Sequence, residues 1–130
     1  MTGRVMLVDD EPFIREAIQI FFRSRGMEIV IAANAEECLD HLERGFRGII
    51  LMDIMMPRLD GWDTIREIVQ RGLFPGNIII MLTAKDEPDE KMNGLQEYVA
   101  DYVAKPCAPQ ELLDTVSYYL GLLEPGVALV

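Results

Sequence analysis

Residues 48–61 read GIILMDIMMPRLDG, and this stretch decides the fold class of the chain. It begins with a continuous apolar run, 48–52, in which apolar and polar residues do not alternate. Such a run is typical of a strand that is buried on both faces of a parallel sheet. The acidic Asp53 follows the run directly, and Asp60-Gly61 comes before an amphipathic segment. The stretch therefore predicts a central parallel strand with an acidic end, followed by a helix.

Four further short apolar runs lie on either side of this strand. They are RVMLV at 4–8, MEIVIA at 27–32, NIIIML at 77–82 and the shortest, DYVA at 101–104, which suits an edge strand. Amphipathic segments separate the runs, and strands that alternate with helices imply right-handed βαβ crossovers in an open parallel sheet. The pattern predicts an α/β domain of the (βα)5 type, with no linker before about residue 121.

Caps and helical spacing predict five helices between and after the strands. Pro12 suits the first turn of one helix, which Gly26 ends. Asn34, followed three residues later by Glu37, resembles a capping box at the start of the next. Apolar spacing predicts the other three: Trp62, Ile65, Ile68 and Val69 for the third; Pro88, Met92, Leu95 and Val99, with Gly94 inside, for the fourth; Pro109, Leu112, Leu113, Val116 and Leu120 for the fifth.

Length and charge exclude several functional classes. The chain has 130 residues, with 22 acidic against 12 basic ones, which allows one domain and argues against direct binding of nucleic acid or an anionic membrane surface. Cys38 and Cys107 stand far apart with no CxxC or Cys/His cluster, which argues against a disulfide framework or a zinc site. No apolar run suits a signal peptide or a membrane span, so we expect a cytoplasmic protein.

Ionisable or hydroxyl residues stand at the ends of four of the five predicted strands. These residues are Asp9 and Asp10 after the first run, Asp53 after the third, Thr83 after the fourth and Lys105 after the fifth. Ligands of open α/β sheets bind beyond the carboxyl ends of the strands. We therefore expect the five side chains to share one site.

The residue types in this predicted site suit phosphoryl chemistry. Three carboxylates in one pocket repel one another unless positive charge intervenes, and Mg²⁺ binds carboxylates, waters and phosphate oxygens. Lys105 and Thr83 suit phosphoryl oxygens. With the charge of the phosphoryl group neutralised, a carboxylate can act as the nucleophile and form an acyl phosphate. Asp53 is the best candidate nucleophile because its strand is central.

The chain resembles the receiver domain of two-component response regulators from about residue 4 to residue 120. The motifs that carry the resemblance are VDDEP at 8–12, DIMMPRLDG at 53–61, TAK at 83–85 and DYVAKP at 101–106. Chance is a poor explanation for these motifs at these spacings. The resemblance implies a flavodoxin-like, doubly wound open sheet of five parallel strands in the order 2-1-3-4-5. It also implies a receiver domain over 1–121, with 122–130 as a tail or truncated linker.

The resemblance implies a role for each acidic residue. Asp53 would accept a phosphoryl group from the phosphohistidine of a sensor histidine kinase or a histidine phosphotransfer protein. Asp10 and Asp53 would bind Mg²⁺ directly and Asp9 through water, with the backbone carbonyl of Met55 as a further ligand. The domain would then be a phosphoacceptor switch rather than an enzyme.

The resemblance also implies how the phosphoryl group would be bound and sensed. Lys105 would pair with it, and the Thr83 hydroxyl and the Ala84 backbone N–H would bind its oxygens. Thr83 and Tyr102 would move together as the switch, and the Lys105-Pro106 peptide bond would be cis, as X-Pro bonds permit. The surface of the last strand and its two flanking helices would then dock an unknown output partner or a second copy of the chain.

Two features depart from the family pattern. Tyr98-Val99-Ala100 stands where receiver domains often have a Gly-Ala pair, and Cys107 stands where Phe is common. Because Gly eases a left-handed turn, we expect a different local backbone before the last strand. Both departures concern the output surface and leave the phosphorylation site intact.

Two other functional classes remain as alternatives. A phosphatase of the haloacid dehalogenase type needs a second Asp two residues after its nucleophile, where this chain has Met55, and 130 residues leave no room for a cap domain. A pseudo-receiver would keep the fold without phosphoryl transfer, although all five site positions are filled here. A nucleotide-binding domain is poorly supported, because neither GxGxxG nor GxxxxGK(S/T) is present.

Overall fold

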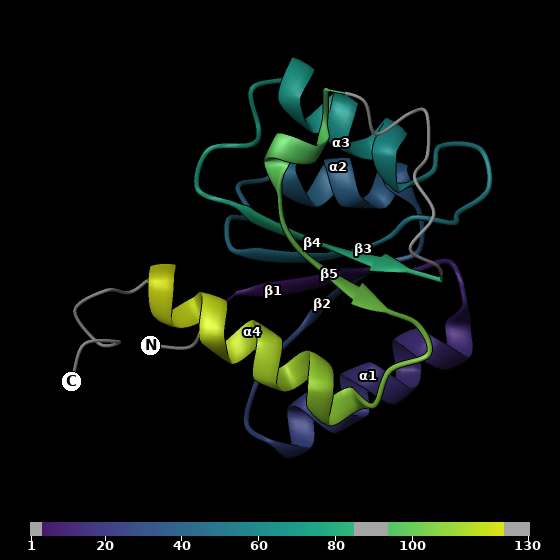
Figure 1. The fold of residues 1–130 in the computed structure, drawn as a ribbon, viewed down its shortest axis with the longest axis vertical. Helices are drawn as coiled ribbons and strands as arrows, with labels where there is room; N and C mark the ends of the chain where they lie inside the picture. Colours follow the sequence, from purple (N-terminus) through teal and green to yellow (C-terminus); the bar gives the residue numbers. More distant parts are fainter. Residues whose placement is uncertain (1–3, 85–93, 124–130) are drawn as a thin grey trace.

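The computed structural model describes residues 4–84 and 94–123 of the chain. Its centre is one sheet of five parallel strands in the order β2-β1-β3-β4-β5 (Figure 1). The strands are β1 (Val5–Val8), β2 (Val30–Ala32), β3 (Ile49–Asp53), β4 (Ile78–Thr83) and β5 (Val99–Ala104). The parallel arrangement and the strand order confirm the predicted flavodoxin-like α/β fold.

Helices cover both faces of this sheet. The α-helices of the described residues are α1 (Pro12–Ser24), α2 (Ala35–Glu43), α3 (Gly61–Gln70) and α4 (Pro109–Leu123). Figure 1 shows α2 and α3 on one face of the sheet and α1 and α4 on the other. Within the described part of the chain, no helix has both the length and the apolar character needed to cross a membrane.

The apolar strand residues divide between two hydrophobic clusters, one on each side of the sheet. On β3, Ile50 and Met52 belong to the cluster with α2 and α3, whereas Ile49 and Leu51 belong to the cluster with α1 and α4. All four side chains are fully buried. Burial on both faces removes every one of these side chains from water, which explains why the run shows no alternation.

Side-chain caps fix where α2 and α3 begin. Asn34 caps α2 by accepting a hydrogen bond from the Glu37 backbone N–H at 2.8 Å, as predicted. The Glu37 carboxylate accepts in turn from the N–H of Ala33, one residue earlier than a capping box requires. Asp60 and Asp63 form a complete capping box at the start of α3. These bonds satisfy N–H groups that the first helical turn leaves unpaired.

The prediction of a helix between β4 and β5 is wrong for the residues that the structure describes there. Pro88 and Met92 lie outside the described residues. Gly94 has a φ of +82°, which belongs to the left-handed region and not to an α-helix. Gln96–Tyr98 form a single 3-10 turn, and Val99 already opens β5. The helix predicted from Pro109 onward is therefore α4.

The two edge strands differ in length from the prediction. β2 has three residues where six were predicted, and β5 has six where four were predicted. Val99 pairs with Ile79 and Asp101 with Ile80, so the pairing skips Ala100 and leaves a bulge there. The backbone at the start of β5 is therefore irregular at Ala100. An edge strand pairs on one side only, so its own sequence sets its ends poorly.

Candidate functional site

Asp9, Asp10 and Asp53 meet at the carboxyl end of the sheet. Asp9 and Asp10 follow β1, Asp53 ends β3, and these two strands are neighbours. One carboxylate oxygen from each residue lies within 4.8 Å of the other two. Asp9 and Asp53 are buried, and Asp10 is half-buried. The structure therefore brings the three predicted acidic residues together, with Asp10 as the most exposed.

Lys105 places a positive charge against this acidic cluster. Its Nζ atom lies 3.2 Å from Asp9 Oδ2 and 3.5 Å from Asp53 Oδ2. Lys105 directly follows β5, and its backbone N–H donates to the Thr83 carbonyl at 2.7 Å, which holds the ends of β4 and β5 together. The Lys105-Pro106 peptide bond is cis in the structure. Residues from β1, β3 and β5 thus share one site.

The charges in the site shift the pKa values of Asp53 and Lys105. Burial raises the pKa of Asp53 to about 6; the Lys105 charge and the Met55 N–H oppose this rise, and the charges of Asp9 and Asp10 add to it. Burial alone would lower the pKa of Lys105, but the carboxylates of Asp53 and Asp9 outweigh it and raise that pKa. Asp53 therefore holds its proton more tightly than an ordinary aspartate does, and positive charge that approaches it favours its ionised form.

The donor atoms fit a hard divalent cation such as Mg²⁺. In the described part of the chain, Lys105 is the one cation within ion-pair distance of the three carboxylates, so these groups carry an excess of negative charge. Among the described residues, no side-chain hydrogen bond or ion pair reaches the Asp10 carboxylate. Mg²⁺ prefers oxygen ligands and is bound through one or two carboxylates plus waters. The three carboxylates together could therefore hold such a metal ion.

The loop after β3 packs tightly against Asp53. The Met55 N–H donates to Asp53 Oδ1 at 3.2 Å, while the Met55 side chain is 71% exposed. The Gly61 N–H donates to the Ile54 carbonyl at 2.9 Å. A Cβ atom on Gly61 would lie 2.7 Å from the Asp53 carbonyl oxygen, closer than real contacts allow. Asp60 therefore caps α3, and glycine is needed at position 61 because a side chain there would overlap the Asp53 backbone.

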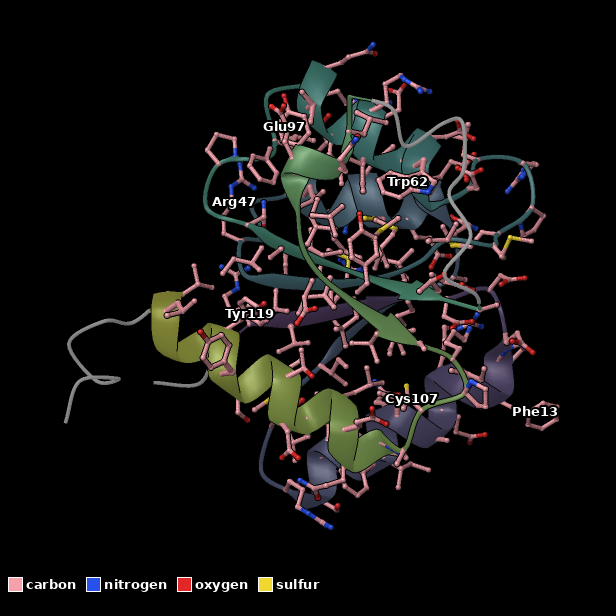
Figure 2. The ribbon with its side chains drawn as sticks, in the orientation of Figure 1. Phe13, Arg47, Trp62, Glu97, Cys107 and Tyr119 are labelled. Carbon is pink, nitrogen blue, oxygen red and sulfur yellow. The ribbon has the colours of Figure 1, made fainter. Side chains whose placement is uncertain are left out.

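The predicted switch residues lie on the neighbouring strands β4 and β5. Thr83 ends β4 and is half-buried, and the next residue, Ala84, is exposed. Tyr102 on β5 is 43% exposed, and its ring centroid lies 6.4 Å from that of Trp62. Trp62 is buried at the start of α3 (Figure 2). Tyr102 therefore lies between solvent and the buried start of α3.

Comparison with known proteins assigns this site to a family. The model of the response regulator receiver domain matches residues 5–117, nearly the whole described fold. The chain belongs to the response regulator receiver domain family. Response regulators act in two-component signalling, in which sensor histidine kinases are their partners.

Relatives of this receiver domain include transcriptional regulators. It is 36% identical to the alkaline phosphatase synthesis transcriptional regulatory protein PhoP of Bacillus subtilis, over 86% of this chain and 46% of that protein. It is also 36% identical to the probable transcriptional regulator ycf27 of Porphyra purpurea, over 95% of this chain and 54% of that protein. The chain thus spans about half the length of the curated relatives it matches.

A crystal structure gives an independent match to the receiver domain. The response regulator receiver domain protein (CheY-like) from Methanospirillum hungatei JF-1 matches with a TM-score of 0.89 and 45% sequence identity. The match covers 95% of this chain and 98% of that one. The similarity therefore extends over nearly the whole of both chains.

Sequence reasoning missed two contacts of this receiver domain. Arg15 on α1 donates a hydrogen bond from Nη1 to the Asp9 carbonyl at 2.8 Å. No motif marks Arg15; the available signal is a basic residue five positions after Asp10. Gly61 lies within a recognised motif, but its close approach to the Asp53 backbone depends on how the loop folds. Both contacts join the start of a helix to the backbone of an acidic residue.

Proposed function

We propose that this receiver domain is a phosphoacceptor switch that takes a phosphoryl group onto Asp53 in an Mg²⁺-dependent reaction. The donor is the phosphohistidine of a sensor histidine kinase or a histidine phosphotransfer protein. The observation that carries the proposal is the convergence of Asp53 with two further carboxylates and with the Lys105 ammonium at 3.5 Å. This is a carboxylate nucleophile, a metal-binding donor set and a phosphoryl-binding cation in one place.

In the transfer step, a carboxylate oxygen of Asp53 forms a bond to phosphorus. The P–N bond of the phosphohistidine breaks, and its electron pair stays on the imidazole nitrogen. After proton exchange the leaving histidine is a neutral imidazole. The product is an acyl phosphate on Asp53. Asp10, Asp53 and the Met55 carbonyl would hold Mg²⁺ directly and Asp9 would hold it through water, and the metal would supply positive charge against the phosphoryl oxygens.

The protein's own groups bind the phosphoryl oxygens after transfer. The Lys105 ammonium moves from the carboxylate of Asp53 to a phosphoryl oxygen, and the Thr83 hydroxyl and the Ala84 N–H bind the others. Movement of Thr83 draws Tyr102, which is 43% exposed, toward the site. The surface that includes β5 and α4 then favours an output partner or a second copy of the chain.

The net charge of the domain bears on the class of partner that it binds. A net charge of −10 disfavours direct contact with DNA, so we propose that the domain acts through protein partners. We propose that the site acts only on its own aspartyl phosphate, so the domain is a switch and not an enzyme that acts on many substrates.

Phosphorylation with a small phosphodonor tests the proposed function. The protein is incubated with acetyl phosphate and Mg²⁺, and intact mass spectrometry is expected to show one added phosphoryl group that maps to Asp53. Asp53→Asn should abolish the adduct, whereas Asp40→Asn, an exposed site on α2, should not. If neither the parent protein nor Asp40→Asn gains a phosphoryl group, the proposed switch is contradicted. Continuous phosphate release from many organic phosphates would instead favour the phosphatase alternative.

A further inference from the structure

Arg15 is the residue of α1 that contacts the backbone of the acidic site. It lies in the first turn of the helix, where its backbone N–H donates to the Glu11 carbonyl at 3.1 Å. Its side chain reaches back six residues, and Nη1 donates to the Asp9 carbonyl at 2.8 Å. Among the described residues, no carboxylate lies within ion-pair distance of Arg15. The guanidinium is therefore engaged by a backbone carbonyl and not by a salt bridge.

This carbonyl has a particular place in the site, because it belongs to the peptide group that joins Asp9 to Asp10. The rest of Asp9 is also held: its N–H donates to the Ala32 carbonyl at 3.1 Å, and its two carboxylate oxygens accept from the Glu11 N–H and from Lys105. With Arg15 on the carbonyl, every polar group of Asp9 has a partner. The plane of the Asp9–Asp10 peptide is thereby fixed.

The orientation of that peptide determines how Asp10 is presented. Asp10 is half-buried, and its carboxylate has no side-chain hydrogen bond among the described residues that could orient it directly. Its direction therefore depends on the backbone that carries it. Removal of a group that orients a metal-binding residue without touching the metal weakens metal binding by about 10- to 100-fold.

We propose that Arg15 is a positioning residue of the metal site: by fixing the Asp9–Asp10 peptide, it sets the affinity of the domain for Mg²⁺. The inference rests on the metal site of the proposed function and deepens it. The two effects of Arg15 on a cation have opposite signs. Its positive charge repels Mg²⁺, so removing the charge alone would strengthen binding. Its hydrogen bond orients Asp10, so removing the bond weakens binding.

Titration with MgCl₂ by calorimetry separates these effects. For Arg15→Gln we expect the Kd for Mg²⁺ to rise about tenfold. Arg15→Lys keeps the charge and can donate one hydrogen bond, so it should restore most of the affinity. The matched control is Arg23→Gln, which makes the same charge change at an exposed position of the same helix. Its Kd should equal that of the unmodified protein or be slightly lower.

Hydrogen exchange in the metal-free proteins provides a readout that does not depend on Mg²⁺. Arg15→Gln should accelerate exchange at the amides of Asp10 and Glu11, while amides of the central strands β1 and β3 keep their protection. Binding of Mg²⁺ by Arg15→Gln as tight as in the Arg23→Gln control, or tighter, would overturn the inference. Uniformly faster exchange across the strands would also overturn it, since Arg15 would then support the whole fold. If the unmodified protein binds no Mg²⁺, the metal site of the proposed function fails, and the inference with it.

Discussion

Lys105 Nζ lies 3.5 Å from Asp53 Oδ2, although the two residues stand at the ends of β5 and β3 with β4 between them. Lys105 also lies 3.2 Å from Asp9 Oδ2, so its ammonium group bridges two strand ends of the sheet. The Lys105 side chain is 20% exposed, whereas those of Asp9 and Asp53 are buried. The bridge is thus largely shielded from water, which strengthens its charge interactions.

Lys105→Met should destabilise the metal-free protein, because it leaves the acidic cluster without this cation. Loss of one partner of a shielded pair costs more than loss of a surface pair. We expect the free energy of unfolding at pH 7, measured with urea, to fall by about 1–3 kcal/mol. Addition of Mg²⁺ should stabilise Lys105→Met at least as much as the unmodified protein, because the metal supplies the missing charge.

The control for Lys105→Met is an exposed ion pair of the same protein. Arg44 pairs with Asp40 at 3.2 Å on α2, with side chains 77% and 56% exposed. Arg44→Met should cost less than about 1 kcal/mol, as surface pairs do. Equal losses for Arg44→Met and Lys105→Met would show that the acidic cluster does not depend on Lys105.

Asp53 should make the stability of the metal-free protein depend on pH. Burial first, and then the charges of Asp9 and Asp10, raise its pKa from the ordinary 3.8 to about 6, against the opposing effect of Lys105. The folded protein therefore binds this proton more tightly than the unfolded chain does. Stability should fall as the pH rises from about 4 to about 6, by roughly 1–3 kcal/mol, and level off above that range.

Asp53→Asn tests this dependence because it removes the charge and keeps the shape. Urea unfolding from pH 4 to pH 8 in the presence of a metal chelator should give a flatter profile than the unmodified protein gives. Asp53→Asn should also be the more stable of the two at pH 7. Parallel profiles for the two proteins would contradict a raised pKa of Asp53, and with it the effect of burial and neighbouring charge described above.

Gly61→Ala should disturb the phosphorylation site, whereas alanine at a glycine in open space should leave that site unchanged. A Cβ atom on Gly61 would lie 2.7 Å from the Asp53 carbonyl oxygen and 2.9 Å from Ile54 Cα, so the backbone must shift. We expect a loss of about 1–3 kcal/mol in unfolding free energy from this overlap. The phosphorylation rate at Asp53 should also fall, because the same shift displaces the nucleophile.

Gly26→Ala is the matched comparison for Gly61→Ala. Gly26 ends α1 with a φ of +79° and has no atom within 4 Å of its missing Cβ. Its replacement should cost about 1–2 kcal/mol through backbone conformation alone and leave phosphorylation unchanged. A normal phosphorylation rate in Gly61→Ala would show that the β3–α3 loop can adapt without moving Asp53.

Much of the sheet and the acidic cluster could be predicted from the sequence, because both depend on burial and strand order. The run 48–52 contacts helices on both faces, so its composition alone marks a central strand. Asp9, Asp10 and Asp53 follow as strand ends once the topology is assumed. Their meeting within 4.8 Å is then a consequence of β1 lying beside β3.

The features that could not be predicted depend on contacts between distant parts of the chain. Val99 has the spacing of a helical residue, but its pairing with Ile79 places it in β5. Gly94 looks like a glycine inside a helix, whereas its φ of +82° excludes one there. The bond from Arg15 to the Asp9 carbonyl depends on the angle at which α1 leaves β1, which no local pattern encodes.

Trp62 should report the phosphorylation state through Tyr102. Trp62 is the single tryptophan of the chain; it is 1% exposed, and its ring centroid lies 6.4 Å from that of Tyr102. If Tyr102 moves toward the site after phosphorylation, the surroundings of the indole change and its emission changes. With Mg²⁺ already present, acetyl phosphate should alter Trp62 fluorescence in the unmodified protein and not in Asp53→Asn. In Tyr102→Ala the response should be largely lost while phosphorylation of Asp53, checked by mass, persists. An undiminished response in Tyr102→Ala would mean that Trp62 senses the phosphoryl group by another route, and that Tyr102 is not the moving part.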